Sequence, residues 1–269
     1  MDLQLRDQVA VVIGGASGIG FAIGKAFAME GASVALVDRS PSVVQVAEGL
    51  AVEGSVRCRG FVADVTDYSA VQQSAAAIER ELGPTRHLAY AAGMGSGKFG
   101  FPFWKLQPSD WDPVLRVNLL GAVHAAHAFA PPMVSAEAGT MLFISSVAGQ
   151  IGSQTDPPYS AAKAALINFA QCSAKDLAPH NVRVNTICPG MIQTPLNRAV
   201  WQAWNNEQPE ALRQTYEAWA GDKVRKLVPL GRWQTPDDVA SLAVFLASAK
   251  ANNITGQTMN VDGGWVMHW

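Results

Sequence analysis

Cysteine is scarce in this sequence, which has only Cys58, Cys172 and Cys188 among its 269 residues. Their odd number and wide spacing fit neither a disulfide framework nor a zinc site. His124 and His127 have a ligand-like spacing but lack a third ligand, so we predict no metal site. No apolar run approaches the roughly 20 residues of a membrane span, and the opening residues MDLQLRD contain no apolar signal region. We therefore expect a soluble protein of a reducing compartment, the cytoplasm.

The sequence also lacks an excess of one charge and a break in composition. It carries 20 basic and 22 acidic residues, and its isoelectric point lies near 6.2. This near balance argues against a surface for nucleic acids or anionic membranes. No low-complexity linker or internal repeat divides the chain, whose length is usual for one large α/β domain with a sizeable core. We expect a single domain over residues 1–269.

Short apolar runs alternate with helical patterns along the chain. Such alternation is typical of right-handed βαβ crossovers, which build a parallel sheet with helices on both faces. The sequence therefore predicts an α/β protein with a doubly wound parallel sheet, a Rossmann fold. The predicted strands are 8–13, 33–37, 56–62, 86–92, 140–145, 182–187 and 257–261, and the predicted helices are 21–30, 41–53, 68–82, 109–134, 159–178 and 236–247.

A glycine-rich turn, GGASGIG at residues 14–20, follows the first predicted strand and opens the first helix. Gly14, Gly18 and Gly20 permit a tight turn and let backbone N–H groups approach a pyrophosphate at the helix N-terminus. An ordinary strand-to-helix turn is the alternative for so short a motif. The second strand, however, leads into Asp38, where an acidic group can bond both ribose hydroxyls. Together these residues predict a dinucleotide site.

The choice of cofactor depends on Asp38 and its neighbour Arg39. The carboxylate would repel the 2′-phosphate of NADP, which favours NAD. Arg39 keeps NADP as the alternative, because an arginine at such a position can receive that phosphate. Ser17, inside the glycine-rich turn, adds no second positive charge. We predict NAD as the cofactor.

Ser146, Tyr159 and Lys163 have a spacing that suits proton transfer. After the two prolines 157–158 the chain reads as a helix start, which places Tyr159 and Lys163 four residues apart on one helical face. A neighbouring ammonium favours the phenolate, so we expect Lys163 to lower the pKa of Tyr159 from its usual value of about 10. Ser146 follows a predicted strand, where its hydroxyl can hold a substrate oxygen. An ordinary exposed helix face is the alternative.

Further motifs follow in order: D64-V65, A91-A-G93, N118, S145-S-V-A-G, Y159-S-A-A-K163, P189-G-M-I-Q-T194 and T255-G-Q-T-M-N-V-D-G-G264. With I13-G-G-A-S-G-I-G and Asp38 they make nearly the whole chain resemble the short-chain dehydrogenase/reductase family. The resemblance implies hydride transfer between a nicotinamide and a secondary alcohol or ketone carbon. It implies a catalytic set of Asn118, Ser146, Tyr159 and Lys163.

The resemblance also implies a role for each site residue. Tyr159 exchanges the hydroxyl proton, Lys163 bonds the nicotinamide ribose, and Asn118 holds a water that relays protons from Lys163, unless it is an ordinary interior residue. Asp64 either holds the adenine amino group or caps the following helix. The implied cofactor contacts are Gly14, Ser17, Gly18, Ile19, Gly20, Asp38, Arg39, Asp64, Val65, Ala92, Gly93, Tyr159, Lys163, Pro189, Gly190, Ile192 and Thr194.

Two departures from the family pattern stand out. Ile13 occupies the place of the usual threonine before the first glycine, so a hydrogen bond within the turn is lost. Ala91 replaces the asparagine of the usual N-A-G, and the residue before it is Tyr90. The missing amide normally braces the sheet near the adenosine side. We expect a cost in stability or cofactor affinity, with the chemistry retained.

Three segments are expected to cover the substrate: residues 95–104, residues 150–156 and a helical cap segment, residues 193–228. The cap segment is rich in aromatic residues, including Trp201 and Trp204. We predict that these two, with Gln150, Ser146 and Tyr159, contact a neutral, moderately bulky and fairly apolar substrate. The alternative is that the aromatics pack on the core or on a neighbouring subunit. The family resemblance further implies a homotetramer.

Three functions fit these observations. The leading one is an NAD-dependent dehydrogenase that acts on a small secondary alcohol or ketone. An NADPH-dependent 3-oxoacyl or ketone reductase is the nearest alternative, and Asp38 disfavours it. A non-catalytic dinucleotide-binding regulatory protein is the alternative from another class. The presence of Ser146, Tyr159 and Lys163 disfavours that alternative, because a site without activity has no physical need for them.

Overall fold

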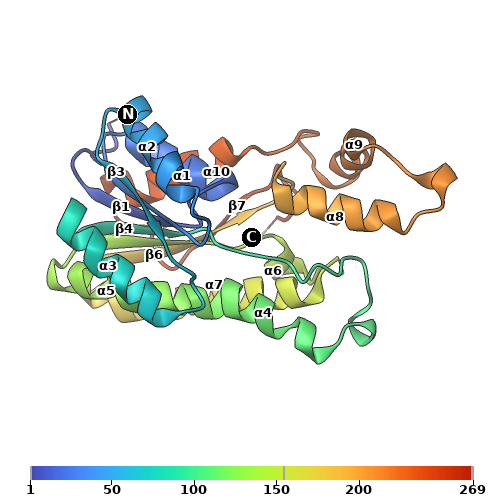
Figure 1. Ribbon diagram of the computed structural model, residues 1–269, viewed down its shortest axis with the longest axis horizontal. Coiled ribbons are helices and arrows are strands. Elements are labelled where there is room, and N and C mark those ends of the chain that lie inside the picture. The colour runs from blue at the N-terminus through green and yellow to red at the C-terminus, as the bar shows by residue number, and fades with distance from the viewer. Residues whose placement is uncertain (1, 154, 268–269) are drawn as a thin grey trace.

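The computed structural model describes residues 2–153 and 155–267, and within these the strands form one parallel sheet of seven. The strand order is β3-β2-β1-β4-β5-β6-β7, and helices cover both faces (Figure 1). The chain runs outward from β1 to β3 and then returns to β4 beside β1. The order reverses there, so the carboxyl ends of β1 and β4 flank the switch point where doubly wound sheets bind ligands. The predicted fold class is confirmed.

Every predicted strand is present, with bounds within two residues of the prediction. All five residues of β1 are buried, because strands of a parallel sheet are covered on both faces and so read as continuous apolar runs. Ala10 and Val12 face one core, and Val9, Val11 and Ile13 face the other. The strands are β1 Val9–Ile13, β2 Ser33–Asp38, β3 Cys58–Val62, β4 Thr85–Tyr90, β5 Gly139–Ile144, β6 Val182–Pro189 and β7 Thr258–Val261.

Two helical layers enclose the sheet (Figure 1). One core contains Phe27 from the first layer and Leu36 from the sheet. The other contains Phe129 from the second layer and Phe143 from the sheet. None of the helices in the described ranges has the length and apolar character needed to cross a membrane. The first layer consists of α1 Gly18–Met29, α2 Val43–Gly54 and α10 Pro236–Ala247, and the second consists of α3 Tyr68–Leu82, α5 Gly121–Ser135 and α7 Pro157–Leu177.

The carboxyl ends of the strands bring the predicted site residues to one edge of the sheet. In a parallel sheet all strands end at the same edge, so residues far apart in sequence become neighbours there. Each of the strands from β1 to β6 ends in, or is followed within three residues by, a predicted cofactor or catalytic residue. These are Gly14, Asp38, Asp64, Gly93, Ser146 and Pro189.

The predicted helix over 109–134 is wrong as a single helix. A short turn at Pro108–Asp110 and α4, Asp112–Leu115, lead into a π-helical turn at Arg116–Leu120, after which α5 begins. Asn118 lies within the π turn, and its side-chain amide donates to the Val114 carbonyl four residues earlier at 2.9 Å. The amide thus takes a carbonyl that a regular helix would give to a backbone N–H.

The cap segment leaves the sheet after β6 and forms two helices, α8 Pro195–Asn206 and α9 Tyr216–Leu227. They project beyond the carboxyl edge of the sheet at the right of Figure 1, and α6, Ala148–Ile151, lies below them in that view, against α7. The hydroxyl of Thr194 accepts from the Asn197 N–H at 3.3 Å and so caps the start of α8. The start of α8 follows the end of β6 within six residues, so a helix stands at this part of the carboxyl edge.

Candidate active site

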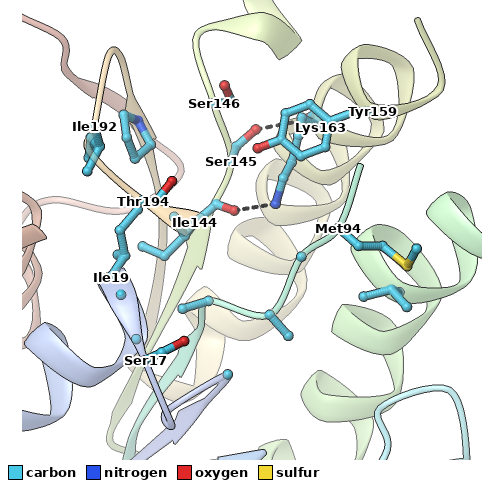
Figure 2. Close-up of a pocket in the computed structure, with 18 of the residues that line it drawn as sticks. Ser17, Ile19, Met94, Ile144, Ser145, Ser146, Tyr159, Lys163, Ile192 and Thr194 are labelled. Carbon is cyan, nitrogen blue, oxygen red and sulfur yellow. Dashed lines mark hydrogen bonds between the residues drawn. The ribbon is translucent and has the colours of Figure 1, made fainter. Parts of the chain in front are cut away.

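One cavity of about 430 Å³ runs along the carboxyl edge of the sheet. It is lined by residues of the glycine-rich turn at one end and by Ser146, Tyr159 and Lys163 at the other. Figure 2 shows Tyr159 and Lys163 on one wall, facing Ile192 and Thr194 on the opposite wall. All predicted cofactor residues line this cavity: Gly14, Ser17, Gly18, Ile19, Gly20, Asp38, Arg39, Asp64, Val65, Ala92, Gly93, Tyr159, Lys163, Pro189, Gly190, Ile192 and Thr194.

The glycine-rich turn leaves the N-terminus of α1 open to the cavity. Gly14 adopts a φ of +82°, which favours glycine, and its N–H donates to the Val37 carbonyl at 2.8 Å. A Cβ on Gly20 would clash with the Gly14 carbonyl oxygen, whereas one on Gly18 would meet open space. Ser17 is the N-cap but makes no side-chain capping bond, so the first N–H groups of α1 have no side-chain acceptor. This cradle fits a pyrophosphate.

Asp38 is held in place by the turn that it faces. One carboxylate oxygen accepts from the Ala16 N–H at 3.1 Å and the other from the Ser40 N–H at 2.9 Å. A carboxylate offers about four acceptor positions, so lone pairs remain for ribose hydroxyls. Arg39 lines the same part of the cavity. Both features on which the prediction of cofactor choice depended are therefore at the site.

Asp64 is not the cap of the following helix. Asp67 has that role, since its carboxylate accepts from the Ala70 N–H at 3.2 Å. Asp64 instead accepts from both the N–H and the hydroxyl of Thr66 at 2.8 Å, and these bonds lower the pKa of its carboxyl. It lines the cavity beside Val65, and its contact with the adenine stays a prediction.

Tyr159 and Lys163 lie on α7, which two hydrogen bonds fasten to the end of β5. The Ser145 hydroxyl donates to the Lys163 carbonyl at 2.8 Å, and the Lys163 ammonium donates to the Ile144 carbonyl at 2.8 Å (Figure 2). The ammonium lies 5.5 Å from the centre of the Tyr159 ring. Ser146 follows in the chain and lines the same cavity. The three predicted catalytic residues are therefore brought together.

Burial, rather than Lys163, dominates the acidity of Tyr159. Burial is the largest cause, the Ser146 hydroxyl lowers the pKa of the phenol and the Asp156 carboxyl raises it, and together they bring this pKa to about 12. Burial also lowers the pKa of the Lys163 ammonium to about 8. The predicted lowering of the Tyr159 pKa by Lys163 is therefore wrong for this structure. At neutral pH the phenol keeps its proton and most of the Lys163 side chains are charged.

Asn118 is fully buried next to Lys163. Its amide nitrogen donates to the Met94 carbonyl at 2.7 Å, in addition to the bond to Val114. Its oxygen, Oδ1, is buried and has no hydrogen-bond partner among the described residues. A Cβ on Gly93 would lie 2.9 Å from this oxygen and 3.3 Å from the Lys163 ammonium, so glycine keeps both groups beside one small space. The arrangement fits a polar relay between Asn118 and Lys163.

Tyr90, one of the departures from the family pattern, braces the π turn. Its ring is fully buried, and its hydroxyl donates to the Val117 carbonyl at 2.5 Å. Gly121 leaves room for this hydroxyl, because a Cβ there would clash with it. Ala91 has no side-chain donor, but its N–H bonds the Ile13 carbonyl at 2.8 Å. A phenol from β4 thus supports the segment that carries Asn118.

The substrate contacts predicted for Trp201 and Trp204 do not agree with the structure. The Trp201 ring packs edge-on against Tyr216, and the Trp204 ring packs against Trp219 at 6.3 Å between centres. Trp219 is 4% exposed and belongs to the core of the cap segment. These aromatic side chains pack on one another and form a small core of the cap segment, separate from the two cores beside the sheet. Neither Trp201 nor Trp204 lines the cavity.

Gln150 also lies outside the cavity lining. Its amide nitrogen donates to the Asn260 side chain on β7 at 2.9 Å, so it ties α6 to the last strand. Sequence reasoning missed Met94, Asn197 and Val200, which do line the cavity. The signal for Asn197 and Val200 was their position in the first two turns of α8, directly after the predicted nicotinamide contact Thr194.

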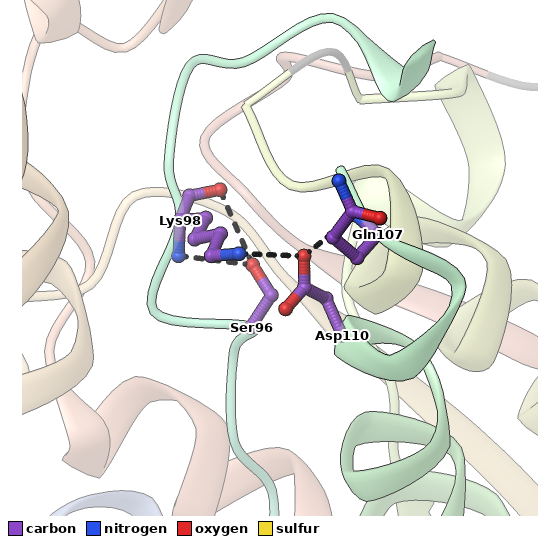
Figure 3. Close-up of polar contacts among 4 residues, drawn as sticks. All are labelled: Ser96, Lys98, Gln107 and Asp110. Carbon is purple, nitrogen blue, oxygen red and sulfur yellow. Dashed lines mark hydrogen bonds and ion pairs between the residues drawn. The ribbon is translucent and has the colours of Figure 1, made fainter. Parts of the chain in front are cut away.

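Residues 95–110, which precede the π turn, are held by polar contacts within the segment and by one contact to Asp156. Lys98 donates to Asp110 at 2.8 Å, and Asp110 also accepts from the Gln107 N–H (Figure 3). The Ser96 N–H donates at 2.8 Å to the carboxylate of Asp156, the residue directly before α7. The aromatic residues of this segment do not all cover the substrate as predicted, since the Trp104 side chain is 71% exposed.

Comparison with known proteins gives the family. The model of the family described as enoyl-(acyl carrier protein) reductase matches residues 14–266. The chain belongs to the short-chain dehydrogenase/reductase family. It is 33% identical over 269 residues to a 3-oxoacyl-[acyl-carrier-protein] reductase of Thermotoga maritima, with 98% of this chain and 100% of the relative covered. It is 34% identical to a D-threitol dehydrogenase of Mycolicibacterium smegmatis, with 99% and 95% covered.

The solved structures agree with this assignment. L-sorbose reductase of Gluconobacter frateurii, in complex with NADPH and L-sorbose, superposes with a TM-score of 0.91 at 27% identity, and the match covers 100% of both chains. The relatives are dehydrogenases and reductases, and this member of the family is likewise an oxidoreductase that acts on CH–OH groups. A non-catalytic regulatory role is therefore not supported.

No metal centre is found within the described ranges, since no group of three potential ligands converges there. His124 instead contacts the Val65 carbonyl through Nδ1 at 2.8 Å and packs on the Tyr68 ring. Its contact with Tyr68 and its hydrogen bond explain its place on α5 without a ligand.

Proposed function

We propose that this enzyme transfers hydride between NAD and the carbon of an uncharged secondary alcohol or ketone. The observation that carries the proposal is the single cavity that joins the glycine-rich cradle to Ser146, Tyr159 and Lys163. A dinucleotide whose pyrophosphate lies at the N-terminus of α1 would extend along this cavity toward Tyr159. When bound, the nicotinamide supplies the hydride donor or acceptor, and the chain supplies positioning and proton transfer.

The residues divide the proton chemistry among them. Ser146 holds the substrate oxygen, and the Tyr159 hydroxyl gives it a proton during reduction or takes one during oxidation. Lys163 carries the positive charge beside the ring and bonds the nicotinamide ribose. Asn118 Oδ1, which is buried and has no partner in the described part of the chain, accepts from a water that passes protons onward from Lys163. These roles extend the family pattern to the geometry of this site.

The proton on Tyr159 supports the reductive direction at neutral pH. A phenol with a pKa of about 12 is a donor below that pH, which suits protonation of a carbonyl oxygen. Oxidation needs the deprotonated phenol, so its rate should rise as the pH rises toward the pKa. We therefore expect the ketone reaction to be the faster one near pH 7.

Asp38 supports NAD as the preferred cofactor. Its carboxylate is fixed by two backbone N–H groups at the end of β2, where a 2′-phosphate would meet a negative charge. An NADPH-dependent ketone or 3-oxoacyl reductase is the second candidate. It is favoured by Arg39, which lines the same part of the cavity, and by the NADPH named for the sorbose reductase structure.

The walls near Tyr159 support an uncharged substrate. Met94, Val117, Ile144 and Val200 supply apolar surface there, and Asn197 adds one polar amide. The other charged residues of the lining, Asp38, Arg39 and Asp64, belong to the cofactor end. An acidic substrate would therefore find no cation apart from Lys163. This favours a neutral alcohol or ketone of moderate size.

The test is a panel of secondary alcohols and matching ketones with NAD(H) and NADP(H), followed by the absorbance of the reduced nicotinamide. Tyr159→Phe is the control: it should lower turnover by at least about 100-fold while reduced-cofactor binding, measured by fluorescence titration, stays within a fewfold. Substantial turnover in this variant would remove Tyr159 from the mechanism. A homotetramer and a cytoplasmic location remain part of the proposal, and light scattering that shows a monomer at micromolar concentration would contradict the first.

A further inference from the structure

A second cavity, of about 170 Å³, lies at the opposite edge of the sheet from the active site. It is formed at the amino ends of β4, β5 and β6 and by the residues that precede β1. A strand of six residues such as β4 spans about 20 Å, so this cavity is separate from the cofactor cleft. Its lining contains Arg86 and Arg183, and none of the residues that line it is acidic.

Arg183, on β6, is buried with 9% of its surface exposed. Its guanidinium donates to the carbonyls of Leu246 at 2.6 Å, Ala247 at 3.2 Å and Ser248 at 3.0 Å, at the C-terminus of α10. A helix C-terminus presents about half a negative charge. Carbonyl dipoles therefore hold this arginine, and no carboxylate among the described residues pairs with it.

His87, on β4, is uncharged at neutral pH, and both of its ring nitrogens contact side-chain oxygens of the cavity. Its Nε2 lies 2.6 Å from the Gln8 side-chain oxygen and its Nδ1 lies 2.8 Å from the Thr140 hydroxyl. The Gln8 amide nitrogen in turn donates to the Gln4 carbonyl at 2.7 Å. Burial and the two arginines lower the pKa of His87 to about 3, so the ring is neutral at pH 7. The oxygens of Gln8 and Thr140 thus serve His87 rather than Arg86.

Arg86 is the second arginine of the cavity, and it differs from Arg183 in its hydrogen bonding. Its guanidinium makes no hydrogen bond or ion pair with any residue of the ranges 2–153 and 155–267. It is only partly exposed, and it lines the same cavity as Arg183. Burial, and after it the charge of Arg86, lowers the pKa of Arg183. Two like charges that face one cavity repel each other, and that repulsion is removed when an anion enters.

We propose that this cavity binds a small oxyanion of the phosphate or carboxylate class, with Arg86 as the direct ligand and Arg183 behind it. The planar guanidinium fork matches the paired oxygens of such anions, which a spherical chloride ion does not present. The cavity is distinct from the active site, so the proposal does not depend on the proposed function.

The test uses the purified full-length protein in chloride buffer, with phosphate or acetate added at constant ionic strength. Isothermal titration should show one phosphate or acetate bound through Arg86, and the melting temperature should rise by about 2–4 °C at saturation. A response to phosphate alone identifies a phosphate site, and a response to acetate identifies a carboxylate site. Arg86→Gln should lose the response while circular dichroism shows the native fold. Arg39→Gln, which alters the cofactor cleft, should keep it.

Arg86→Asp gives a second, opposite test. It places a carboxylate beside Arg183, so the protein should melt at least as high in chloride as the wild type does in phosphate, and added phosphate should have no further effect. Three results would overturn the proposal: a wild-type response to both oxyanions no larger than that to chloride, a response retained in Arg86→Gln, or a response lost in Arg39→Gln, which would place the anion in the cofactor cleft.

Discussion

Removal of the Tyr90 hydroxyl should weaken both the fold and the placement of Asn118. In Tyr90→Phe the ring keeps its packing against Phe143, whose centre lies 6.5 Å away, but the donor to the Val117 carbonyl is lost. A buried acceptor left without its partner costs about 1–3 kcal/mol. In a chain of this size each kcal/mol lowers the melting temperature by about 2–4 °C. Urea denaturation should show the same decrease in the free energy of unfolding.

The same change should reach the chemistry through Asn118, the next residue along the π turn. Asn118 borders Lys163, so a displaced turn moves the relay oxygen and should lower kcat by about tenfold, equivalent to about 1.4 kcal/mol. The cofactor KM should change little, because Tyr90 does not line the cavity.

Tyr68→Phe is the matched control. Tyr68 is 37% exposed, and its hydroxyl makes no hydrogen bond within the described part of the chain. Melting temperatures are compared at one protein concentration, since an oligomer melts in a concentration-dependent way. If Tyr90→Phe matched Tyr68→Phe in both stability and kcat, the phenol would not be what supports the π turn.

Three further predictions follow from the structure. Asp38→Ser should shift the ratio of kcat/KM for NAD over NADP toward NADP by at least about tenfold, or about 1.4 kcal/mol; a wild type that already prefers NADP would contradict our interpretation of Asp38. His87 has a pKa of about 3 when folded and about 6.5 when unfolded, so the unfolded chain binds the extra proton between these values. The free energy of unfolding should therefore be unaffected by this group above pH 6.5 and should fall by up to about 1.4 kcal/mol per pH unit from there toward pH 3. Urea titrations at several pH values should show a smaller fall of this free energy in His87→Gln than in the wild type. Trp219→Ala should destabilise the protein by about 3–5 kcal/mol and leave the kinetics of the folded protein unchanged, whereas a tenfold rise in substrate KM without loss of stability would return this residue to the pocket wall.

Local patterns were sufficient for most of the fold and for the centre of the site. The buried strands read as continuous apolar runs, and the glycine-rich turn, Tyr159 and Lys163 are set by spacings of a few residues. Parallel strands then bring Asp38 and Ser146 to one edge whatever the length of the connections between them. For this reason motif order alone predicted that these residues line one cavity.

Long-range packing decided the remaining features. At the break in the predicted helix over 109–134, the Tyr90 hydroxyl from β4 donates to the Val117 carbonyl, and no periodicity within that segment reports this contact. Trp201 and Trp204 have the spacing of a pocket wall, but α9 offers them aromatic partners and they pack there instead.

Burial depends on the same long-range packing, because it is set by every segment that surrounds a side chain. Lys163 lies one turn from Tyr159 in the sequence pattern, which predicts a lowered phenol pKa. In the structure, desolvation by the surrounding segments outweighs that charge and raises the pKa to about 12. Arg86 and Arg183 likewise belong to separate strands, β4 and β6, whose amino ends only the tertiary fold places at one cavity. The sequence by itself determined which chemical groups the protein has and the order of its elements. The tertiary structure decided how strongly those groups are buried and which of them face each other.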